Sequence, residues 1–361
     1  MTIHERLARL RAAMAAQGLD ALLVSQPENR RYLSGFTGSA GVLAISAERA
    51  LLATDFRYYQ QVQAQAPDFE LVQVPRSLVE TLPEVIARLG GGLRLGFESQ
   101  HVTVDQYGQW GAAVKGVSWV PTVGLVENLR AIKDARELAL MSEAVRLADE
   151  AMLHIMDWIR PGVTEREIAW ELEVHMRTHG AQALAFTTIV ASGPNGDMPH
   201  AVTTDRPVAV GDGLTIDMGA VYQGYLSDLT RSFCLGRATD EYARVWRTVL
   251  EAQVAAERAI RAGMSGIEAD GIARGAIYGA GYEGRFGHGL GHGVGLAIHE
   301  DPPRAGMTSQ ATLQPDMVLT VEPGIYIPGW GGVRIEDMVV IGADGCRILT
   351  QAPKEMVIGR A

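Results

Sequence analysis

Apolar and polar positions divide the first part of the chain into short alternating segments. Residues 3–17 carry apolar side chains at helical spacing, which predicts a helix ending at Gly18, and the apolar run 21–24 predicts a buried strand. Further strands are predicted over 40–45, 51–54, 71–74 and 93–98, and further helices over 56–66 and 77–89. Strands that alternate with helices in this way indicate an α/β domain.

The pattern changes near residues 126–135. The mostly apolar run 117–126 stops there, and the segment 127–136 is rich in charged residues. A single long helical pattern follows over 137–159. We therefore predict two domains, an α/β domain over 1–128 and a second domain over 129–361.

The second domain contains an internal repeat. Residues 159–167 resemble residues 260–268, and each copy holds the Ser/Thr-x-x-Glu signature of a capping box, which satisfies free amides at a helix start. The two capping boxes are Thr164 with Glu167 and Ser265 with Glu268. Each predicted helix runs to a glycine suited to a C-terminal cap, Gly180 or Gly281. The repeat predicts two related halves.

Each half also offers a pair of acids on strand-like sequence. Asp217 and Asp228 are separated by the turn sequence Gly-Ala-Val-Tyr-Gln-Gly, and Glu322 and Glu336 by Pro-Gly-Trp-Gly-Gly. A hairpin in each half could place its two acids opposite each other, with Asp217 facing Asp228. Two such hairpins related by pseudo-symmetry would bring four carboxylates to one centre.

A histidine completes this set of potential metal ligands. His292 lies in a glycine-rich run between the two acid pairs. Two divalent cations carry four positive charges, which balance four carboxylates and allow the acids to share a buried site. Donors that are mostly oxygen with one nitrogen favour Mn²⁺ or Co²⁺, whereas a structural zinc site favours sulfur or several imidazoles.

Composition excludes several other classes of function. The chain has 361 residues, a net charge of −10 and no basic cluster, which argues against a nucleic-acid or anionic-membrane surface. The two cysteines, Cys234 and Cys346, form no Cys-x-x-Cys motif. The N-terminus has no apolar signal core, and no apolar run approaches the ~18 residues of a membrane span. We expect a cytoplasmic protein.

Three motifs carry a family resemblance. They are His-Gly-x-Gly-His-Gly-x-Gly-Leu-x-x-His-Glu, Glu-Pro-Gly-Ile-Tyr and Gly-Val-Arg-Ile-Glu-Asp. The second domain resembles the α+β pita-bread fold shared by methionine aminopeptidase, aminopeptidase P and prolidase. With its creatinase-like α/β N-terminal domain, the whole chain resembles the Xaa-Pro peptidase branch. The resemblance implies two divalent ions, most often Mn²⁺ with Co²⁺ or Zn²⁺ as alternatives. Their ligands would be Asp217, Asp228, His292, Glu322 and Glu336.

The same resemblance implies roles for further residues. His200 and His299 would position the carbonyl and stabilise the intermediate, and His288 would border the pocket for the proline ring. Glu322 would also transfer a proton. From the residues themselves, Arg334 could anchor a ligand carboxylate, support Asp228, or form a plain ion pair with the neighbouring acids.

The leading hypothesis is an Xaa-Pro aminopeptidase that acts on peptides with proline at the second position. The alternative within the class is prolidase, which is restricted to dipeptides. A catalytically silent peptide-binding module and a creatinase-like hydrolase of small guanidino acids are disfavoured, because all five ligands are present. The resemblance also implies a homodimer, and we expect neither nucleic acid nor membrane as a partner.

Overall fold

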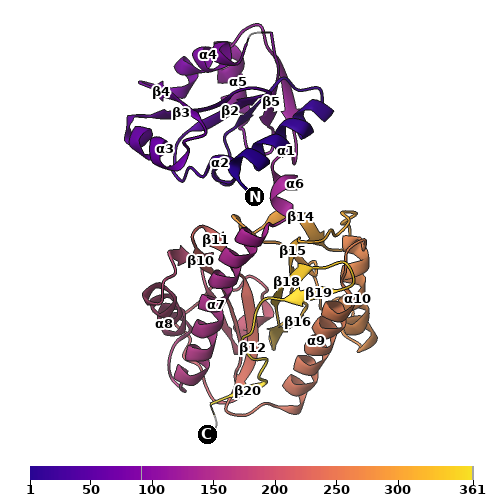
Figure 1. The fold of residues 1–361 in the computed structure, drawn as a ribbon. Coiled ribbons are helices and arrows are strands. Elements are labelled where there is room, and N and C mark those ends of the chain that lie inside the picture. The colour runs from indigo at the N-terminus through magenta and orange to yellow at the C-terminus, as the bar shows by residue number, and fades with distance from the viewer. Residues whose placement is uncertain (91, 360–361) are drawn as a thin grey trace. The chain divides into compact units, whose positions relative to one another are not determined.

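The structure of the chain is a computed structural model that describes residues 1–90 and 92–359. Its internal contacts divide it into two compact units, Met1–Arg130 and Ala131–Ala361 (Figure 1). The predicted domain boundary between residues 128 and 129 falls inside a short helix, α6 (Glu127–Ala131).

The first unit is built on a mixed six-stranded sheet with the order β4-β3-β2-β1-β5-β6. Strand β1 pairs antiparallel with β2 and parallel with β5. Its strands are β1 (Ala21–Val24), β2 (Val42–Ser46), β3 (Ala50–Asp55), β4 (Glu70–Val74), β5 (Arg94–Glu98) and β6 (Ser118–Thr122). Its helices are α1 (Ile3–Ala16), α2 (Pro27–Ser34), the 3-10 turn η1 (Phe56–Tyr58), α3 (Tyr59–Gln65), α4 (Leu78–Leu89) and α5 (Val104–Ala113).

Alternate side chains along a strand point to the same face of the sheet, and this shows where the hydrophobic core of the first unit lies. Ala21 and Leu23 of β1 face a cluster that includes Leu82 of α4 and Trp110 of α5, so these helices cover one face of the sheet. The predicted α/β organisation is confirmed. Helices α2 and α5 were not predicted. The sequence of α2 is polar, and its buried residues include Asn29, so it lacks the apolar stripe on which helix prediction depends.

The second unit consists of two similar halves. The first half holds α7 (Ala135–Trp158), α8 (Glu165–Thr178), β7 (Ala183–Leu184), β8 (Ile189–Ser192), the 3-10 turn η2 (Gly193–Asp197), β9 (Gly213–Met218), β10 (Ala220–Tyr222), β11 (Tyr225–Leu226) and β12 (Leu229–Leu235). The second holds α9 (Asp240–Ala259), α10 (Gly266–Gly279), β13 (Gly291–Gly293), β14 (Glu300–Ala305), β15 (Val318–Val321), β16 (Gly324–Ile327), β17 (Gly331–Arg334), β18 (Asp337–Ile341), β19 (Cys346–Ile348) and β20 (Val357–Ile358). None of the described helices is both long and apolar enough to cross a membrane.

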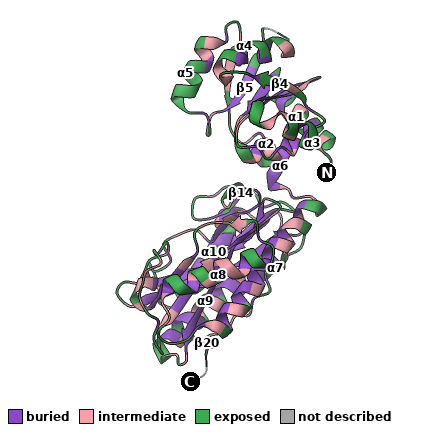
Figure 2. Cartoon of the chain, turned by 90° about the vertical axis from the view of Figure 1, so that its left-hand side faces the viewer, coloured by how far each residue is buried: buried purple, intermediate pink, exposed green. Residues whose placement is uncertain are grey.

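The two halves pack as strands flanked by helix pairs. Figure 1 shows α7 and α8 on one side of the strands and α9 and α10 on the other. The sheets have the orders β20-β12-β9-β8 and β14-β13-β15-β18-β19. One hydrophobic cluster joins α7 and α8 to β9 and β12, and another joins α9 and α10 to β15 and β18. Figure 2 shows that the strands are mostly buried, whereas the helices expose their outer faces.

The predicted internal repeat is confirmed at the starts of the equivalent helices. Thr164 caps α8 and Ser265 caps α10, each through a complete capping box. Each cap residue also forms an isolated antiparallel bridge to a later segment, Thr164 with Pro207 and Ser265 with Thr312. Both helices end shortly before a glycine with positive φ, Gly180 or Gly281.

The predicted hairpins form, with one correction of register. Strand β9 pairs with β12, and β15 pairs with β18. Asp217 lies opposite Thr230, however, and not opposite Asp228. The expectation was wrong because the connection between the inner strands forms a smaller hairpin of its own, β10 with β11, which leaves Asp228 just before the start of β12.

Candidate metal centre and substrate cavity

The five predicted ligands lie at the ends of the paired inner strands. Asp217 is on β9 and His292 is on β13. The other three are junction residues: Asp228 directly precedes β12, Glu322 directly follows β15, and Glu336 directly precedes β18. Each junction links an inner strand pair to an outer hairpin. The side chains at these junctions therefore meet where the two halves face each other.

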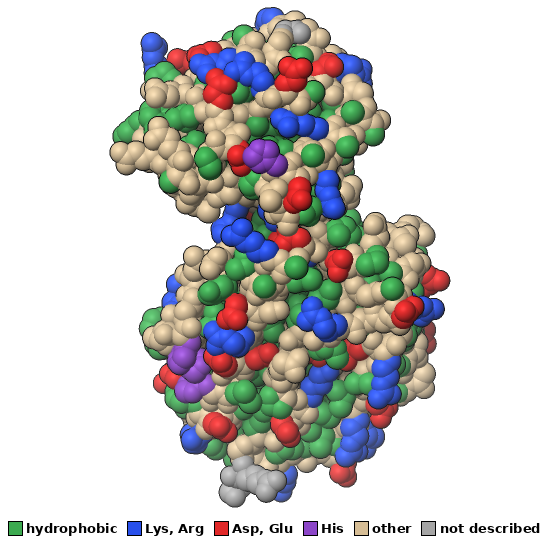
Figure 3. Space-filling view, in the orientation of Figure 1, with side chains coloured by type: hydrophobic (Ala, Val, Ile, Leu, Met, Phe, Trp, Pro, Cys, Tyr) green, Lys and Arg blue, Asp and Glu red, His purple; other side chains and the backbone are tan. Residues whose placement is uncertain are grey.

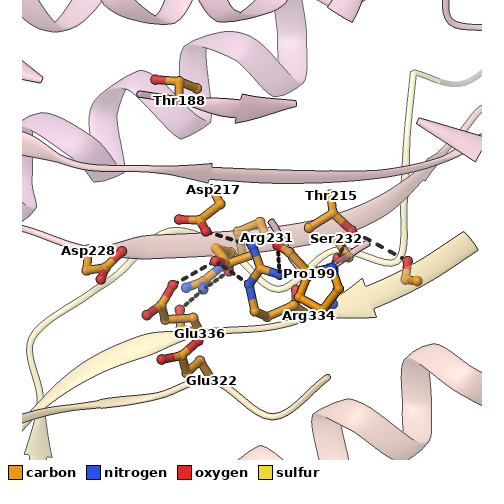
Figure 4. Close-up of polar contacts among 12 residues, drawn as sticks. Thr188, Pro199, Thr215, Asp217, Asp228, Arg231, Ser232, Glu322, Arg334 and Glu336 are labelled. Atoms are coloured by element: carbon orange, nitrogen blue, oxygen red, sulfur yellow. Dashed lines mark hydrogen bonds and ion pairs between the residues drawn. The ribbon is translucent and has the colours of Figure 1, made fainter. Parts of the chain in front are cut away.

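The structure brings the predicted ligand atoms together. One ligand atom each from Asp228, His292 and Glu336 lies within 4.8 Å of the others. His292 Nε2 lies 3.6 Å from Asp228 Oδ2 and 3.4 Å from Glu322 Oε1. Figure 4 shows Asp217, Asp228, Glu322 and Glu336 converging from strands of both halves.

The surroundings of Asp217 are consistent with a cation at this centre. Its Oδ2 accepts a hydrogen bond of 2.6 Å from Arg334, but its Oδ1 is buried and has no hydrogen-bond partner among the described residues. A buried carboxylate oxygen without a partner costs free energy. A metal ion would supply that partner, and carboxylate oxygens with one imidazole suit a divalent cation.

The electrostatics of the acids agree with this fit. Burial first, and then the charges of the neighbouring acids, raise the pKa of Asp228 well above its ordinary value. The same two causes raise the pKa of Glu336, and burial raises the pKa of Glu322 to about 8. Acids that resist ionisation alone become stable as carboxylates when cations neutralise them.

His292 is held in the tautomer that metal binding requires. Its Nδ1 donates to the backbone oxygen of Gly293 at 3.0 Å, which leaves the lone pair of Nε2 directed toward the acids. Burial lowers the pKa of His292 to about 4, so the ring is neutral at neutral pH.

Two threonine hydroxyls orient the ligands, and the sequence analysis did not single them out. Thr230 donates to Glu336 Oε2 at 2.6 Å, and Thr320 donates to Glu322 Oε1 at 3.2 Å. Thr320 also accepts from the backbone N–H of His292 at 3.0 Å. Each threonine lies two positions from an acid along its strand, so the side chains share one face of the sheet. That spacing is the signal that could have found them.

Arg334 is occupied by interactions inside the protein. It donates to Asp217, to Thr230 Oγ1 at 3.1 Å, to the backbone oxygen of Pro199 at 3.1 Å and to the Tyr326 hydroxyl at 3.0 Å. The side chain is buried. The support that the sequence analysis assigned to Asp228 therefore goes to Asp217, and few of the Arg334 donors remain for a ligand carboxylate.

A cavity of about 1170 Å³ opens onto the centre. All five predicted ligands line it, together with His200, His288, His299 and Arg334. His200 and His299 are exposed, and the His299 ring contacts the edge of His292 with ring centroids 4.2 Å apart. The cavity extends to Trp170 of α8, and Arg304 of β14 also lines it. The sequence analysis missed both residues because neither belongs to a motif.

Close backbone packing explains the glycine-rich run around His292. A Cβ atom on Gly291 would lie 1.9 Å from the backbone oxygen of Thr320, and one on Gly293 would lie 2.6 Å from that of Glu300. Any side chain at these positions would push β13 away from its neighbours. The glycines therefore let β13 present His292 between β14 and β15.

A buried acid near the start of α8 and another near the start of α10 form hydrogen bonds that hold the segments carrying His200 and His288. Glu165 of α8 accepts hydrogen bonds from backbone and side-chain groups of Ser192 and Thr204, which flank the loop that carries His200. On α10, Asp270 accepts from the Leu290 backbone N–H at 3.0 Å, and its ion-pair partner Arg274 donates to the His288 backbone oxygen at 2.7 Å.

Comparison with known proteins gives consistent results. The model for Metallopeptidase family M24 matches residues 139–343, and the model for the Creatinase/Prolidase N-terminal domain matches residues 6–132. An uncharacterized peptidase of Bacillus subtilis is 42% identical over 353 residues, which cover 98% of this chain and 99% of that protein.

Solved structures resemble the chain over nearly its whole length. An Xaa-Pro dipeptidase from Bacillus anthracis has a TM-score of 0.95 and 42% identity, covering 99% of this chain and 100% of that chain. An X-Pro aminopeptidase from Thermotoga maritima has a TM-score of 0.88 and 37% identity, covering 96% and 100%.

Proposed function

The chain belongs to metallopeptidase family M24, and we propose that it is an Xaa-Pro aminopeptidase, which releases the N-terminal residue from peptides with proline at the second position. The observation that carries this proposal is the cavity, which joins a converging set of metal-ligand atoms to three non-ligand histidines and reaches as far as Trp170. The two solved relatives named above are an Xaa-Pro dipeptidase and an X-Pro aminopeptidase, which supports this proposal.

Metal binding is implied by the family, and we propose that two Mn²⁺ ions are held by Asp217, Asp228, His292, Glu322 and Glu336, with Co²⁺ or Zn²⁺ as alternatives. The oxygen-rich donor set supports manganese. Ions at this centre would lower the pKa of a water molecule and polarise the scissile carbonyl.

The residues around the ligands supply the remaining chemistry in this proposal. His200 and His299 face the cavity, where their N–H groups can hydrogen-bond the carbonyl oxygen as it gains negative charge. Burial lowers the pKa of His299, which favours the neutral ring as a donor. Each imidazole would then hold the reacting group in place.

The departing proline requires a proton. As in any amide hydrolysis, the nitrogen must gain a proton to leave as an amine, and in a peptide bond the proline nitrogen carries no hydrogen of its own. We assign this transfer to Glu322, which lines the cavity. Thr320 donates to Oε1, and the second oxygen, Oε2, accepts no hydrogen bond from the described residues, so we assign the proton to Oε2.

The proline ring requires an apolar and aromatic border. His288 lines the cavity, packs edge-on against Phe286 and bonds through Nε2 to the Tyr326 hydroxyl at 2.9 Å. Burial lowers the pKa of His288 to about 4, so it presents an uncharged ring. These contacts support its assignment to the proline subsite.

Cavity size favours the aminopeptidase over the dipeptidase alternative. Drug-sized ligands occupy pockets of roughly 300–1,000 Å³, and a dipeptide is smaller than such ligands, whereas this cavity measures about 1170 Å³. One observation favours the dipeptidase. Arg304 lines the cavity, is exposed, and has no ion pair or hydrogen bond to its guanidinium among the described residues. It could therefore hold the carboxylate of an Xaa-Pro dipeptide.

Product analysis separates the two functions. The Mn²⁺-loaded enzyme would be offered Ala-Pro and Ala-Pro-Ala separately, and alanine release would be measured for the wild type and for Arg304→Ala. Alanine from the tripeptide supports the aminopeptidase. Cleavage of the dipeptide but not of the tripeptide by the wild type, with a higher KM for the dipeptide in Arg304→Ala, would establish the dipeptidase. Cleavage of neither by the metal-loaded protein would reject both.

A further inference from the structure

A second group of histidines lies away from the catalytic cavity. His154 is on α7, His175 is on α8, and His179 is the C-terminal cap of α8. None of the three lines the cavity described above. Figure 3 shows histidine side chains gathered on the surface of the second unit, over the position that α8 occupies in Figure 1. The function proposed above does not use them.

The three rings form a stacked column. His175 stands between the others, with its ring centroid 4.4 Å from that of His154 and 4.0 Å from that of His179. The ring planes deviate by only 18° and 19°. A proton on the central His175 ring would be repelled by charge on either neighbouring ring at these distances. Burial, together with the neighbouring histidines, accordingly lowers the pKa of His175.

Hydrogen bonds set the tautomer of the exposed ring. His179 Nδ1 donates to the backbone oxygen of His175 at 2.7 Å, so Nε2 of His179 carries a free lone pair. His292 uses the same arrangement at the catalytic centre, where its Nδ1 donates to Gly293. The ring nitrogens of His175 have no hydrogen-bond partner in the described part of the chain. Each ring therefore has a nitrogen lone pair available, and the exposed His179 ring can direct its lone pair toward an ion shared with His175 by rotating out of the stack.

The spacing of these two histidines matches a metal-binding pattern. Residues four apart on a helix lie on the same face, and two histidines at this spacing can share one ion. Two acidic side chains lie near the column: Glu171 bonds to His154 Nε2 at 2.7 Å, and the charges of Glu150 and Glu171 act on His175. These carboxylates favour a cation near the column.

We propose that His175 and His179 form a second metal site, which binds a divalent transition ion that prefers imidazole, such as Ni²⁺, Zn²⁺ or Cu²⁺. Mn²⁺ prefers oxygen ligands and would not compete for it. Among the described residues only Asp228, His292 and Glu336 bring three ligand atoms within 4.8 Å. The second site is therefore a two-histidine site, completed by water, and it binds more weakly than the catalytic centre.

Nickel binding to the tag-free, Mn²⁺-loaded protein tests this proposal. Equilibrium dialysis against micromolar Ni²⁺ would compare the wild type with the variant His175→Ala/His179→Ala. We expect the wild type to bind about one more nickel ion per chain than the double variant. Hydrolysis of proline peptides without nickel should be the same in both proteins. Nickel that displaces manganese at the catalytic centre would be equal in both and cancels in the comparison.

Two single variants make the result decisive. His179 is exposed, so His179→Ala should fold normally and should weaken nickel binding by about tenfold or more, the scale of a lost ligand interaction. His101→Ala, which removes an exposed histidine of the first unit, should bind nickel as the wild type does. Equal nickel binding by the wild type, His179→Ala and the double variant would overturn the proposal.

Discussion

At the scale of single residues, the candidate centre depends on hydroxyl groups as well as on ligands. Thr320 joins the backbone of His292 to the carboxylate of Glu322 through one oxygen. Replacing Thr320 with valine keeps the shape of the side chain but leaves a buried N–H without a partner. We predict that Thr320→Val weakens Mn²⁺ binding by about 10–100-fold, the usual cost of removing such an outer contact.

Calorimetric titration with Mn²⁺ would measure this effect. Thr215→Val is a matched control, because Thr215 is a buried strand threonine whose hydroxyl pairs with Ser232 at 2.8 Å and not with a ligand. The control should bind Mn²⁺ as the wild type does. Unchanged affinity in Thr320→Val would show that the hydroxyl does not orient the ligands.

The non-ligand histidines should behave differently. His200 and His299 face the cavity and are not part of the converging ligand group. We predict that His200→Ala and His299→Ala retain bound metal but lose kcat by about 10²-fold or more, the scale of a lost oxyanion or proton-transfer group. Metal analysis with steady-state kinetics would check this. Loss of metal in either variant would make that histidine a ligand, and unchanged kcat would remove it from the mechanism.

The sequence predicted the ligand residues more easily than their supports. The positions of Asp228, His292 and Glu336 followed from dense local motifs, and the structure brings these side chains together. The threonines were not predicted, because threonine is common in strands and its partner is decided by strand pairing. Arg334 was recognised, but its choice of Asp217 over Asp228 depends on a register that sequence does not specify.

At the scale of elements, α8 positions the loop that carries His200. Glu165 at the start of α8 is fully buried and accepts hydrogen bonds from Ser192, Asn195 and Thr204 on both sides of that loop. Glu165→Gln removes the charge and replaces one acceptor oxygen with a donor. We predict a lower thermal midpoint and a kcat reduced by about tenfold or more, with bound metal retained.

Glu167→Gln is the matched control for this prediction. Glu167 lies in the same helical turn but is exposed, and it acts only in the capping box with Thr164. Glutamine also serves in a capping box, so this variant should keep kcat and nearly all stability. Equal kinetics in the two variants would mean that Glu165 does not position the His200 loop.

Elements with strong local signals were predictable. The capping boxes and terminal glycines of α8 and α10 fixed both helix starts and ends. The outer hairpin β10–β11 was not separated from the inner pair, because both appear in sequence as one turn between two acids. The parallel pairing of β12 with β20 joins residues far apart in the chain, and local patterns contain no information about it.

At the scale of the whole molecule, buried acids give the catalytic unit an unusual dependence on pH, and two of them have pKa values of about 8. Burial raises the pKa of Glu322 and of Glu257 from 4.5 to about 8. Glu257 lies near Lys354 and near Asp337, which directly follows the predicted ligand Glu336 in the sequence. An acid with a raised pKa binds more protons in the folded state than in the unfolded state. Its contribution to stability is full below pH 4.5 and is lost as the pH rises through 8.

We therefore predict that the metal-free protein loses stability between pH 7.5 and 8.5, by on the order of 1 kcal/mol per pH unit for each acid. The pKa values of His288 and His292 are lowered to about 4, so these rings add a slope of opposite sign near pH 6.5, where histidines of the unfolded chain still bind protons, and almost none above pH 7.5. Hydrogen exchange of the amides in β15 and β18 would report the stability of the catalytic unit at each pH.

Loading with Mn²⁺ and the substitution Glu257→Gln should separate the pH dependence due to Glu322 from that due to Glu257. Mn²⁺ replaces the proton on Glu322, so the loaded protein should retain only the slope due to Glu257, because that residue is not among the predicted ligands. Glu257→Gln should remove the other part of the slope with or without metal. When Glu257→Gln is combined with bound Mn²⁺, stability should be nearly flat from pH 7.5 to 8.5. A metal-free wild type that gains stability over this range would contradict the assignment, because its acids would then be ionised and stabilised without a cation.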